Sequence, residues 1–321
     1  MLPDCCASGG VCFRSRGRFA PAGIRVAGSG GEKAEAGNAM HFMLDPADFK
    51  QAIQAIDALG ATPAVLVRVI ALAKDPNTDL ETLCALLRND GPLAADIIRI
   101  GNSPYYSPAL PFGNLTDAVH QIGMRELIWV IDLSLARQLF ARDLPGYGIT
   151  AYDYWNGAVA AALMMEALAR YVGLDPEDAY TIGILHAIGR ILIGRVIEER
   201  GFSLYWESPQ PITDWERGAV GFDSGEAGAM LLEHWSFPPT TCDVIRWQAS
   251  REKVVEEVSL LGALQFTLRL LPLTGLDFAR EGWQLPAEDP FLQASGLTSA
   301  MAPIIEGCRE NFQRLLKSVH W

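Results

Sequence analysis

The metal-binding and redox patterns that many enzymes use are scarce in this 321-residue sequence. Its five histidines include no pair with the i, i+4 spacing that places two imidazoles on one face of a helix. Its six cysteines include no C-x-x-C pair, and Cys84, Cys242 and Cys308 each stand alone within an apolar helical pattern, as buried free thiols do. We therefore expect a protein without a disulfide framework, located in a reducing cytoplasm.

Other common functional signals are also missing. The sequence has no G-x-x-x-x-G-K-[ST] or G-x-G-x-x-G loop for phosphate binding and no G-x-S-x-G turn for a nucleophilic serine. No run reaches the roughly 18 consecutive apolar residues that a membrane span needs. The sequence thus predicts neither a P-loop protein, nor a serine hydrolase, nor an integral membrane protein.

Basic residues are outnumbered, and the formal net charge is −12. Residues 1–40 contain five basic and three acidic residues, a net of +2, so the remainder carries −14. An acidic surface repels phosphate backbones, and no basic stripe with interleaved aromatic residues is present. We expect no nucleic acid partner.

The first 39 residues lack apolar periodicity and are rich in Gly, Ala, Ser and Arg, so we expect 1–39 to be a disordered extension. An organelle transit peptide is an alternative, but Pro21 and the glycines oppose the amphipathic helix that it needs. A start site assigned too far upstream is another, since Met40 and Met43 directly precede the first helical pattern.

From Asp45 onward, apolar residues recur at helical spacing, and prolines, glycines and capping residues mark the helix ends. Thr78 to Glu81 has the spacing of a capping box. One helix from Asp175 to about Glu198 is expected to carry His186, whereas residues 201–223 hold many turn formers. Because no convincing alternating strand occurs, the expected fold class is all-α, a two-lobed helical bundle.

Pro145 to Gly148 has the composition of a linker between the two lobes. The expected domain covers residues 45–285, with an N-terminal lobe at 45–145 and a second lobe at 150–285. Residues 286–321 are expected to add a loop and a helix that pack on this domain.

Four segments of the first lobe, in this order, resemble the HDOD family of bacterial signalling domains. They are Leu59–Val65, Asn89–Leu93, Gly101–Tyr106 and Ala118–Gly123. The resemblance covers about residues 55 to 250 and includes His186-Ala187, which is similar to the His-Asp pair of related metal-dependent phosphohydrolases. It implies a second lobe with the fold of those hydrolases.

The resemblance also implies where a working hydrolase would hold its metal ligands. A first His is expected at Asn156 or Gly157, the Asp of the pair at Ala187, and a later His at Ser224. A catalytic metal needs about three protein ligands, and these positions offer one imidazole, that of His186. We therefore expect no catalytic residue, no bound metal, no cofactor and no enzymatic activity.

His186 has two interpretations, of which the structural one is favoured. In the first, Gly183 and Gly189 let a neighbouring helix approach closely, and His186 bonds a backbone carbonyl. In the second, a pocket persists in which His186 and Arg190 contact an anionic ligand such as a nucleotide phosphate.

The proline-rich segment from Gly101 to Asn114 has a similar pair of interpretations. Asn102 and Ser103 are expected to cap helix ends and fix this loop. Alternatively, they form a partner surface with the aromatic residues Tyr105, Tyr106 and Phe112.

The favoured hypothesis is a non-catalytic regulatory domain of bacterial signal transduction that binds an unidentified signalling protein or a small ligand. A phosphohydrolase or phosphodiesterase with ligands recruited from Asp153, Asp223, Glu226 or His234 is the first alternative. A metal-free nucleotide sensor is the second. The sequence does not indicate the partner or the oligomeric state.

Overall fold

The computed structural model describes residues 51–54, 56, 64–73, 75, 77–103, 106, 108, 110–199, 205–206, 211–250, 258–274, 276 and 289–318. Within these ranges the regular elements are helices, and the one extended contact is an isolated bridge between Leu144 and Ile149. The expected all-α fold is confirmed. The extension expected at residues 1–39 lies outside the described residues.

The first helices of the described chain begin at side chains that cap their N-termini. Asp79, Asp90 and Asn114 each accept a hydrogen bond from the backbone N–H three residues further on. The capping box expected at Thr78 to Glu81 is therefore wrong by one residue, because Asp79 has the extended backbone of the cap. The three capped helices are α3 (Leu80–Leu87), α4 (Gly91–Gly101) and α5 (Leu115–Ile122). They lie along the chain between α2 (Ala64–Ala73) and α6 (Met124–Leu139), which starts after Gly123 without a side-chain cap.

The helix α7 (Ala151–Val172) is the centre of the second lobe. Thr150 caps its first turn, and Gly173 ends it with φ of +76°, a conformation that favours glycine. Every residue from Tyr154 to Met165 is buried, so α7 is covered on all sides over these turns. It packs against α6, α8, α13 and α15.

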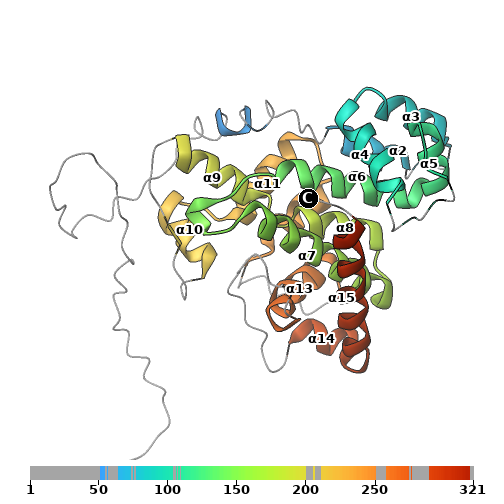
Figure 1. The fold of residues 1–321 in the computed structure, drawn as a ribbon. Coiled ribbons are helices and arrows are strands. Elements are labelled where there is room, and N and C mark those ends of the chain that lie inside the picture. Colours follow the sequence, from blue (N-terminus) through green and yellow to red (C-terminus); the bar gives the residue numbers. More distant parts are fainter. Residues whose placement is uncertain are drawn as a thin grey trace, which may run out of the picture.

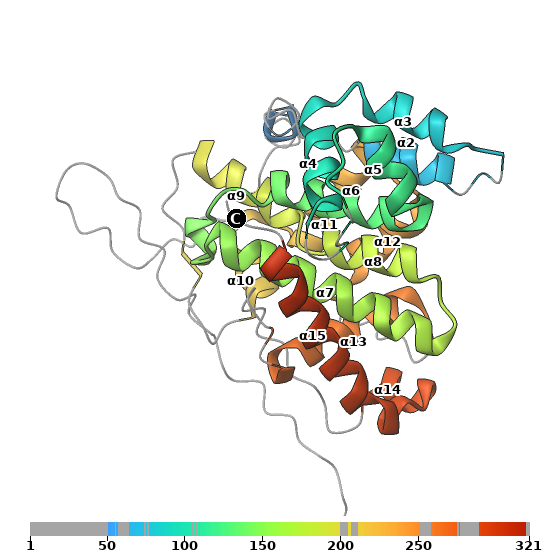
Figure 2. The same ribbon diagram turned by 45° about the vertical axis from the view of Figure 1, so that its right-hand side comes forward.

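The remaining helices surround α7 (Figures 1 and 2). They are α8 (Pro176–Leu185), α9 (Gly189–Glu199), α10 (Ile212–Val220), α11 (Ser224–His234), α12 (Pro239–Trp247), α13 (Leu260–Thr274), α14 (Pro290–Ser295) and α15 (Met301–Ser318), with 3-10 turns η1 (Pro145–Tyr147) and η2 (Leu297–Ala300).

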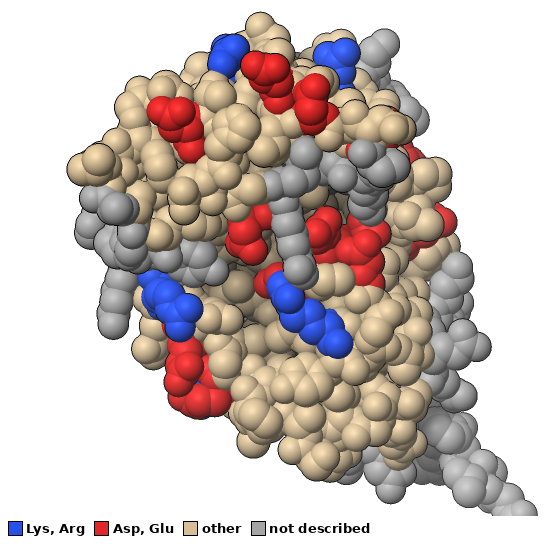
Figure 3. Space-filling view, turned by 90° about the vertical axis from the view of Figure 1, so that its right-hand side faces the viewer, with Lys and Arg blue, Asp and Glu red and all other residues tan. Residues whose placement is uncertain are grey.

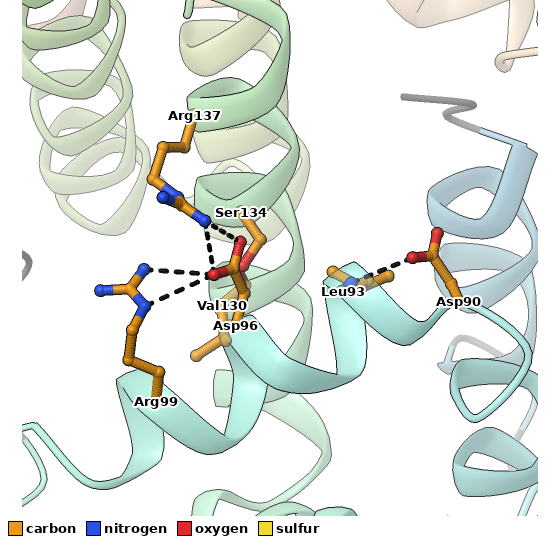
Figure 4. Close-up of polar contacts among 7 residues, drawn as sticks. All are labelled: Asp90, Leu93, Asp96, Arg99, Val130, Ser134 and Arg137. Carbon is orange, nitrogen blue, oxygen red and sulfur yellow. Dashed lines mark hydrogen bonds and ion pairs between the residues drawn. The ribbon is translucent and has the colours of Figure 1, made fainter. Parts of the chain in front are cut away.

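The two lobes meet at α6. The helices α2 to α5 form a group at one end of the molecule, and α7 to α15 form the larger body (Figures 1 and 2). Between them, α6 packs against α2, α4 and α5 on one side and against α7 and α8 on the other. An ion pair attaches α4 to α6: one guanidinium nitrogen of Arg137 lies 2.6 and 2.7 Å from the two carboxylate oxygens of Asp96 (Figure 4).

The C-terminal segment packs on the second lobe. On α15, Cys308, Phe312 and Leu315 are buried, and the Cys308 thiol lies 3.6 Å from the carbonyl oxygen of Leu163 on α7. Burial raises the pKa of this thiol to about 12. Cys84 and Cys242 are also buried and free, so all three described cysteines match the expectation.

The single helix expected from Asp175 to Glu198 is wrong, since the chain breaks at residues 186–188 into α8 and α9. Arg190 and Ile191 donate to the carbonyls three residues back, those of Ala187 and Ile188, instead of four back. The carbonyls that a continuous helix would use are bonded elsewhere: Gln248 Nε2 donates to His186 O at 2.7 Å, and the Tyr154 hydroxyl donates to Ala187 O.

The segment 201–223 also differs from the expectation, because it contains the helix α10. Ile212 and Val220 are buried on this helix, and Glu216 lies between them on the same face. Pro145 to Gly148, expected as a linker, forms the turn η1, whose Tyr147 is 1% exposed.

One stretch of the described chain, Pro176–Glu199, is long and apolar enough to cross a membrane. It includes both α8 and α9. Of its most apolar window, 83% is buried inside the protein, as in a core helix.

Candidate functional site

The turn between α8 and α9 places His186 inside the protein. The side chain is 2% exposed, and its Nδ1 lies 2.7 Å from the carbonyl oxygen of Gly183. Asp175 caps α8 by accepting from the N–H groups of Glu177 and Asp178, which fixes the start of the helix that ends at this turn. The backbone hydrogen bond is the one that the structural interpretation of His186 predicts.

Two glycines beside His186 allow close helix contacts. A Cβ at Gly183 would lie 2.5 Å from the Cα of Ala162 on α7. At Gly189 it would lie 1.9 Å from the carbonyl oxygen of Ser224 and 2.5 Å from the amide nitrogen of Gly228, both on α11. The turn is therefore held directly against α7 and α11, which leaves no gap beside His186 at these two crossings.

The positions at which the family resemblance implies lost metal ligands are all buried, and the structure occupies them with uncharged groups. Ala187 is 2% exposed, and Ser224 is 5% exposed. Asn156 is fully buried, and neither atom of its amide has a hydrogen-bond partner within the described part of the chain. Gly157 has no side chain to offer and is buried on α7.

A buried carboxylate that the sequence analysis missed lies at this site. Glu216 on α10 is fully buried; its Oε1 accepts from the Tyr147 hydroxyl at 3.1 Å, and its Oε2 accepts from the backbone N–H of Ser224 at 2.8 Å. The spacing of Ile212, Trp215 and Ala219 would have placed Glu216 on an apolar helical face. A charged residue on such a face is the signal that could have found it.

Arg190 supplies the positive charge near this carboxylate. It is 3% exposed, and its guanidinium carbon lies 5.9 Å from the centroid of the Tyr147 ring, within range of a cation–π contact. Burial raises the pKa of Glu216 to about 7, and the charge of Arg190 opposes this rise. Burial and the nearby Glu216 raise the pKa of Tyr147 well above its usual value.

These residues do not fit a divalent metal ion. Across the described ranges, no group of three or more His, Cys, Asp or Glu side chains could hold one. A cation beside Glu216 would also meet the charge of Arg190, which repels it. These side chains form a packed polar cluster, defined by Tyr147, Arg190, Glu216 and Ser224. The turn that carries His186 packs against Ser224 through Gly189.

The residues considered as recruited ligands have other contacts. Asp223 and Glu226 form a capping box at the start of α11, and both also pair with Arg217, at 2.6 and 3.3 Å. His234 ends the same helix, roughly 15 Å away at 1.5 Å per residue. The backbone N–H of Asp153 donates to Thr150 in the first turn of α7. The structure thus brings together Asp223 and Glu226, but not His234.

The anionic-ligand interpretation also meets an obstacle. His186 and Arg190 are 2% and 3% exposed, so neither presents a surface to a ligand in solution. A nucleotide phosphate would therefore reach them only if the surrounding helices moved apart.

In the proline-rich segment, Asn102 closes the loop. Its amide donates to the carbonyl of Phe112 at 3.0 Å, and its carbonyl oxygen accepts from the N–H of Phe112 at 2.7 Å. The expected fixing role of Asn102 is confirmed. Ser103 is buried, and its hydroxyl has no hydrogen-bond partner among the described residues, so its side chain does not show the same role.

The alternative for this segment was an exposed aromatic patch, and the structure describes two of its three aromatic residues. Tyr106 and Phe112 are half-buried and pack against the core. Tyr105 lies outside the described residues. Leu110 is the exposed apolar side chain of the described part of this loop, at 79%.

Comparison with known proteins identifies the fold. Residues 59–251 match the family model described as the HDOD domain. An uncharacterized protein of Treponema pallidum (strain Nichols) is 23% identical over 228 residues, which make up 67% of this chain and 43% of that protein. The match therefore spans less than half the length of this relative.

Three solved structures have the same helical fold. An HDOD domain protein of unknown function from Geobacter sulfurreducens has a TM-score of 0.53 at 20% identity, over 81% of this chain and 98% of its own. A provisionally named phosphohydrolase from Shewanella amazonensis SB2B has a TM-score of 0.54 at 22% identity, over 83% of this chain and 94% of its own. A provisionally named signal transduction protein from Marinobacter aquaeolei VT8 has a TM-score of 0.63 at 20% identity, over 87% of this chain and 66% of its own.

Proposed function

Since this chain belongs to the HDOD domain family, we propose that it is a non-catalytic regulatory protein of bacterial signal transduction that acts by binding a protein or a small ligand. The observation that carries this proposal is the buried polar cluster. Beside the position of the implied ligand at Ser224, Arg190 and Glu216 provide opposite charges, and Ser224 itself donates its backbone N–H to Glu216.

The chemistry of this cluster favours structure over catalysis. Water activation at neutral pH requires a bound metal or a general base that can reach a substrate. Glu216 has a pKa near neutrality, but it is fully buried and its two oxygens already accept hydrogen bonds from Tyr147 and Ser224. We infer that Glu216 fixes the positions of α10 and α11 beside the turn that carries His186.

The cysteines and one solved relative support the proposed cellular location and the proposed regulatory role. The three described cysteines are buried free thiols, which supports the proposed cytoplasmic location. The solved relative named for signal transduction supports a regulatory role. The partner is proposed to be a signalling protein, and nucleotide binding at His186 is disfavoured because that residue and Arg190 are buried.

The direct test is metal analysis of the full-length protein, purified without chelators, together with hydrolysis of bis(p-nitrophenyl) phosphate and cyclic dinucleotides in added Mn²⁺. We expect metal far below one equivalent and no hydrolysis above the protein-free rate. One equivalent of iron, manganese or zinc that is lost with His186→Ala would overturn the proposal.

A variant that restores the Asp of the His-Asp pair at residue 187 tests whether this site can hold a metal ion. Ala187→Asp should destabilise the protein by roughly 3 kcal/mol, because Ala187 is 2% exposed and a new carboxylate there lacks a partner. Ala187→Asn is the matched control of the same shape without charge. If Mn²⁺ raised the Tm of the wild type or of the Asn variant, the site would hold a metal without the lost Asp, contrary to the proposal.

A further inference from the structure

A cavity whose lining includes none of the polar-cluster residues lies where α6, α7, α8 and α15 meet. It has a volume of about 230 Å³. The face of the molecule shown in Figure 3 is hollowed across its middle, and acidic side chains gather along this hollow with basic side chains beside them. The helices of both lobes contribute to the cavity, since α6 joins them.

Most of the charged side chains that line the cavity are acidic. Its acidic side chains are Glu126, Asp132, Glu166 and Glu177, and its one basic side chain is Arg170. Four carboxylates and one guanidinium give a formal charge of −3 when all are ionised. Arg170 pairs with Glu166, four residues earlier on α7.

Two aromatic rings line the same cavity. Trp129 on α6 and Tyr180 on α8 have ring centroids 5.9 Å apart, at an interplanar angle of 48°. Aromatic faces attract alkylammonium and guanidinium groups, whereas a bare divalent ion needs several clustered oxygen ligands. Such a group of acidic ligands is not found among the described residues. The lining therefore suits an organic cation and not a metal ion.

Asp132 provides an independent indication of a missing partner. Its side chain is fully buried beneath the cavity; Oδ2 accepts from the Thr181 hydroxyl at 2.7 Å, and Oδ1 has no hydrogen-bond partner within the described ranges. A buried carboxylate oxygen without a partner is costly, and a donor that enters the cavity would remove this cost.

We propose that this cavity binds an organic cation, a primary ammonium or a guanidinium group, with Asp132 as its charge partner and Trp129 and Tyr180 as its walls. The volume suits the end of a lysine or arginine side chain or a small free amine. Both sources offer the same chemistry. The site is separate from the buried polar cluster and does not depend on the function proposed above.

The protonation state of Asp132 gives the proposal a pH signature. Burial raises the pKa of Asp132 to about 7, and the Thr181 hydrogen bond opposes the rise. The other ionisable groups that line the cavity are Glu126 on α6, Glu166 and Arg170 on α7, and Glu177 and Tyr180 on α8, while α15 contributes the neutral Asn311. A cation binds the ionised form of Asp132, so its binding should release a proton below pH 7.

The test is titration calorimetry of the full chain with 1,4-diaminobutane, methylguanidinium and a capped lysine tripeptide. The neutral control is 1,4-butanediol, which has the length of the diamine without its charge. We expect at least one cation to bind, the diol not to bind, and affinity to rise about tenfold from pH 6 to pH 8, as the ionised fraction of a group with pKa near 7 does. Binding of the peptide alone would assign the site to a partner's side chain, and binding of a free amine would assign it to a small molecule.

Asp132→Asn should weaken binding at least tenfold and remove the pH dependence, because the amide still accepts from Thr181 but carries no charge. Glu81→Gln, an exposed change of the same charge on α3, should alter affinity less than twofold. If Asp132→Asn does not fold, wild-type titrations in two buffers of different ionisation enthalpy will still report proton release. Absence of binding by all three cations, equal binding of the diol, or cation binding to the wild type without proton release at pH 6 would each overturn the proposal.

Discussion

Glu216 shows how one residue can control the pH dependence of stability. Its pKa is raised from 4.5 in the unfolded chain to about 7 in the folded protein, chiefly by burial. The folded state therefore holds this proton more tightly, and the group reduces stability as the pH rises from 4.5 through 7. The difference of about 2.5 pKa units corresponds to roughly 3 kcal/mol lost by pH 8.

Glu216→Gln should remove this part of the pH dependence. The amide can still accept from the Ser224 N–H and donate to the Tyr147 oxygen, so packing is preserved. Urea unfolding should show that the free energy of unfolding of the wild type falls from pH 5 to pH 8. For the variant this fall should be smaller by roughly 2 to 3 kcal/mol. Asp132 adds a slope of the same sign, which remains in the variant. Equal slopes in Glu216→Gln and in the exposed control Glu81→Gln would contradict the assignment.

At the scale of the element, the contact between α9 and α11 depends on the absence of a side chain. Gly189→Ala should destabilise the protein by about 2 to 4 kcal/mol, because its Cβ would lie 1.9 Å from the carbonyl oxygen of Ser224 and force the helices apart. Gly218→Ala is the matched control: this glycine lies on α10 with no atom within 4 Å of the new Cβ. It should be neutral or stabilising by up to about 1 kcal/mol. Thermal and urea unfolding of both variants provide the measurement, and similar losses in the two would refute the steric argument.

The helices themselves show what the sequence could predict. Local signals lie at both ends of α7, where Thr150 caps the first turn and Gly173 ends the helix, and such signals are readable from the sequence. The break at residues 186–188 was not predictable in this way, because Tyr154 and Gln248 bond the carbonyls of the turn from distant positions in the chain. The helix α10 was missed because the turn formers around it hid the spacing of Ile212, Trp215 and Glu216.

The candidate site was predictable in one respect and not in another. The motif His186-Ala187 and its glycines indicated a buried imidazole with a backbone partner, as the bond to Gly183 shows. The charges beside it could not be inferred, since Tyr147, Arg190 and Glu216 come from three separate elements. Tyr147 was expected in a linker and Glu216 in a loop, and they become neighbours only when the chain is folded.

At the scale of the whole molecule, α6 is the element through which the two lobes are joined. It contacts α2, α4 and α5 as well as α7 and α8, and it lines the acidic cavity with Trp129 and Asp132. A change in the packing of the first lobe on α6 would therefore shift the cavity residues that α6 carries. Occupancy of the cavity and the attachment of the first lobe are expected to be coupled in the same way.

The ion pair between Asp96 and Arg137 is the place to test this attachment. Arg137→Gln should cost about 1 to 3 kcal/mol, because it leaves the carboxylate of Asp96, which is 5% exposed, without its short contacts at 2.6 and 2.7 Å. Arg99→Gln is the matched control, since Arg99 is about as exposed as Arg137 but approaches the same carboxylate at 3.4 Å from α4 itself (Figure 4). Hydrogen exchange should speed up in α4 and α5 of the Arg137 variant while α7 and α13 stay protected, because the tether is lost but the second core is intact. Faster exchange throughout both lobes, or an equal effect of Arg99→Gln, would show that this pair does not specifically hold the first lobe to α6.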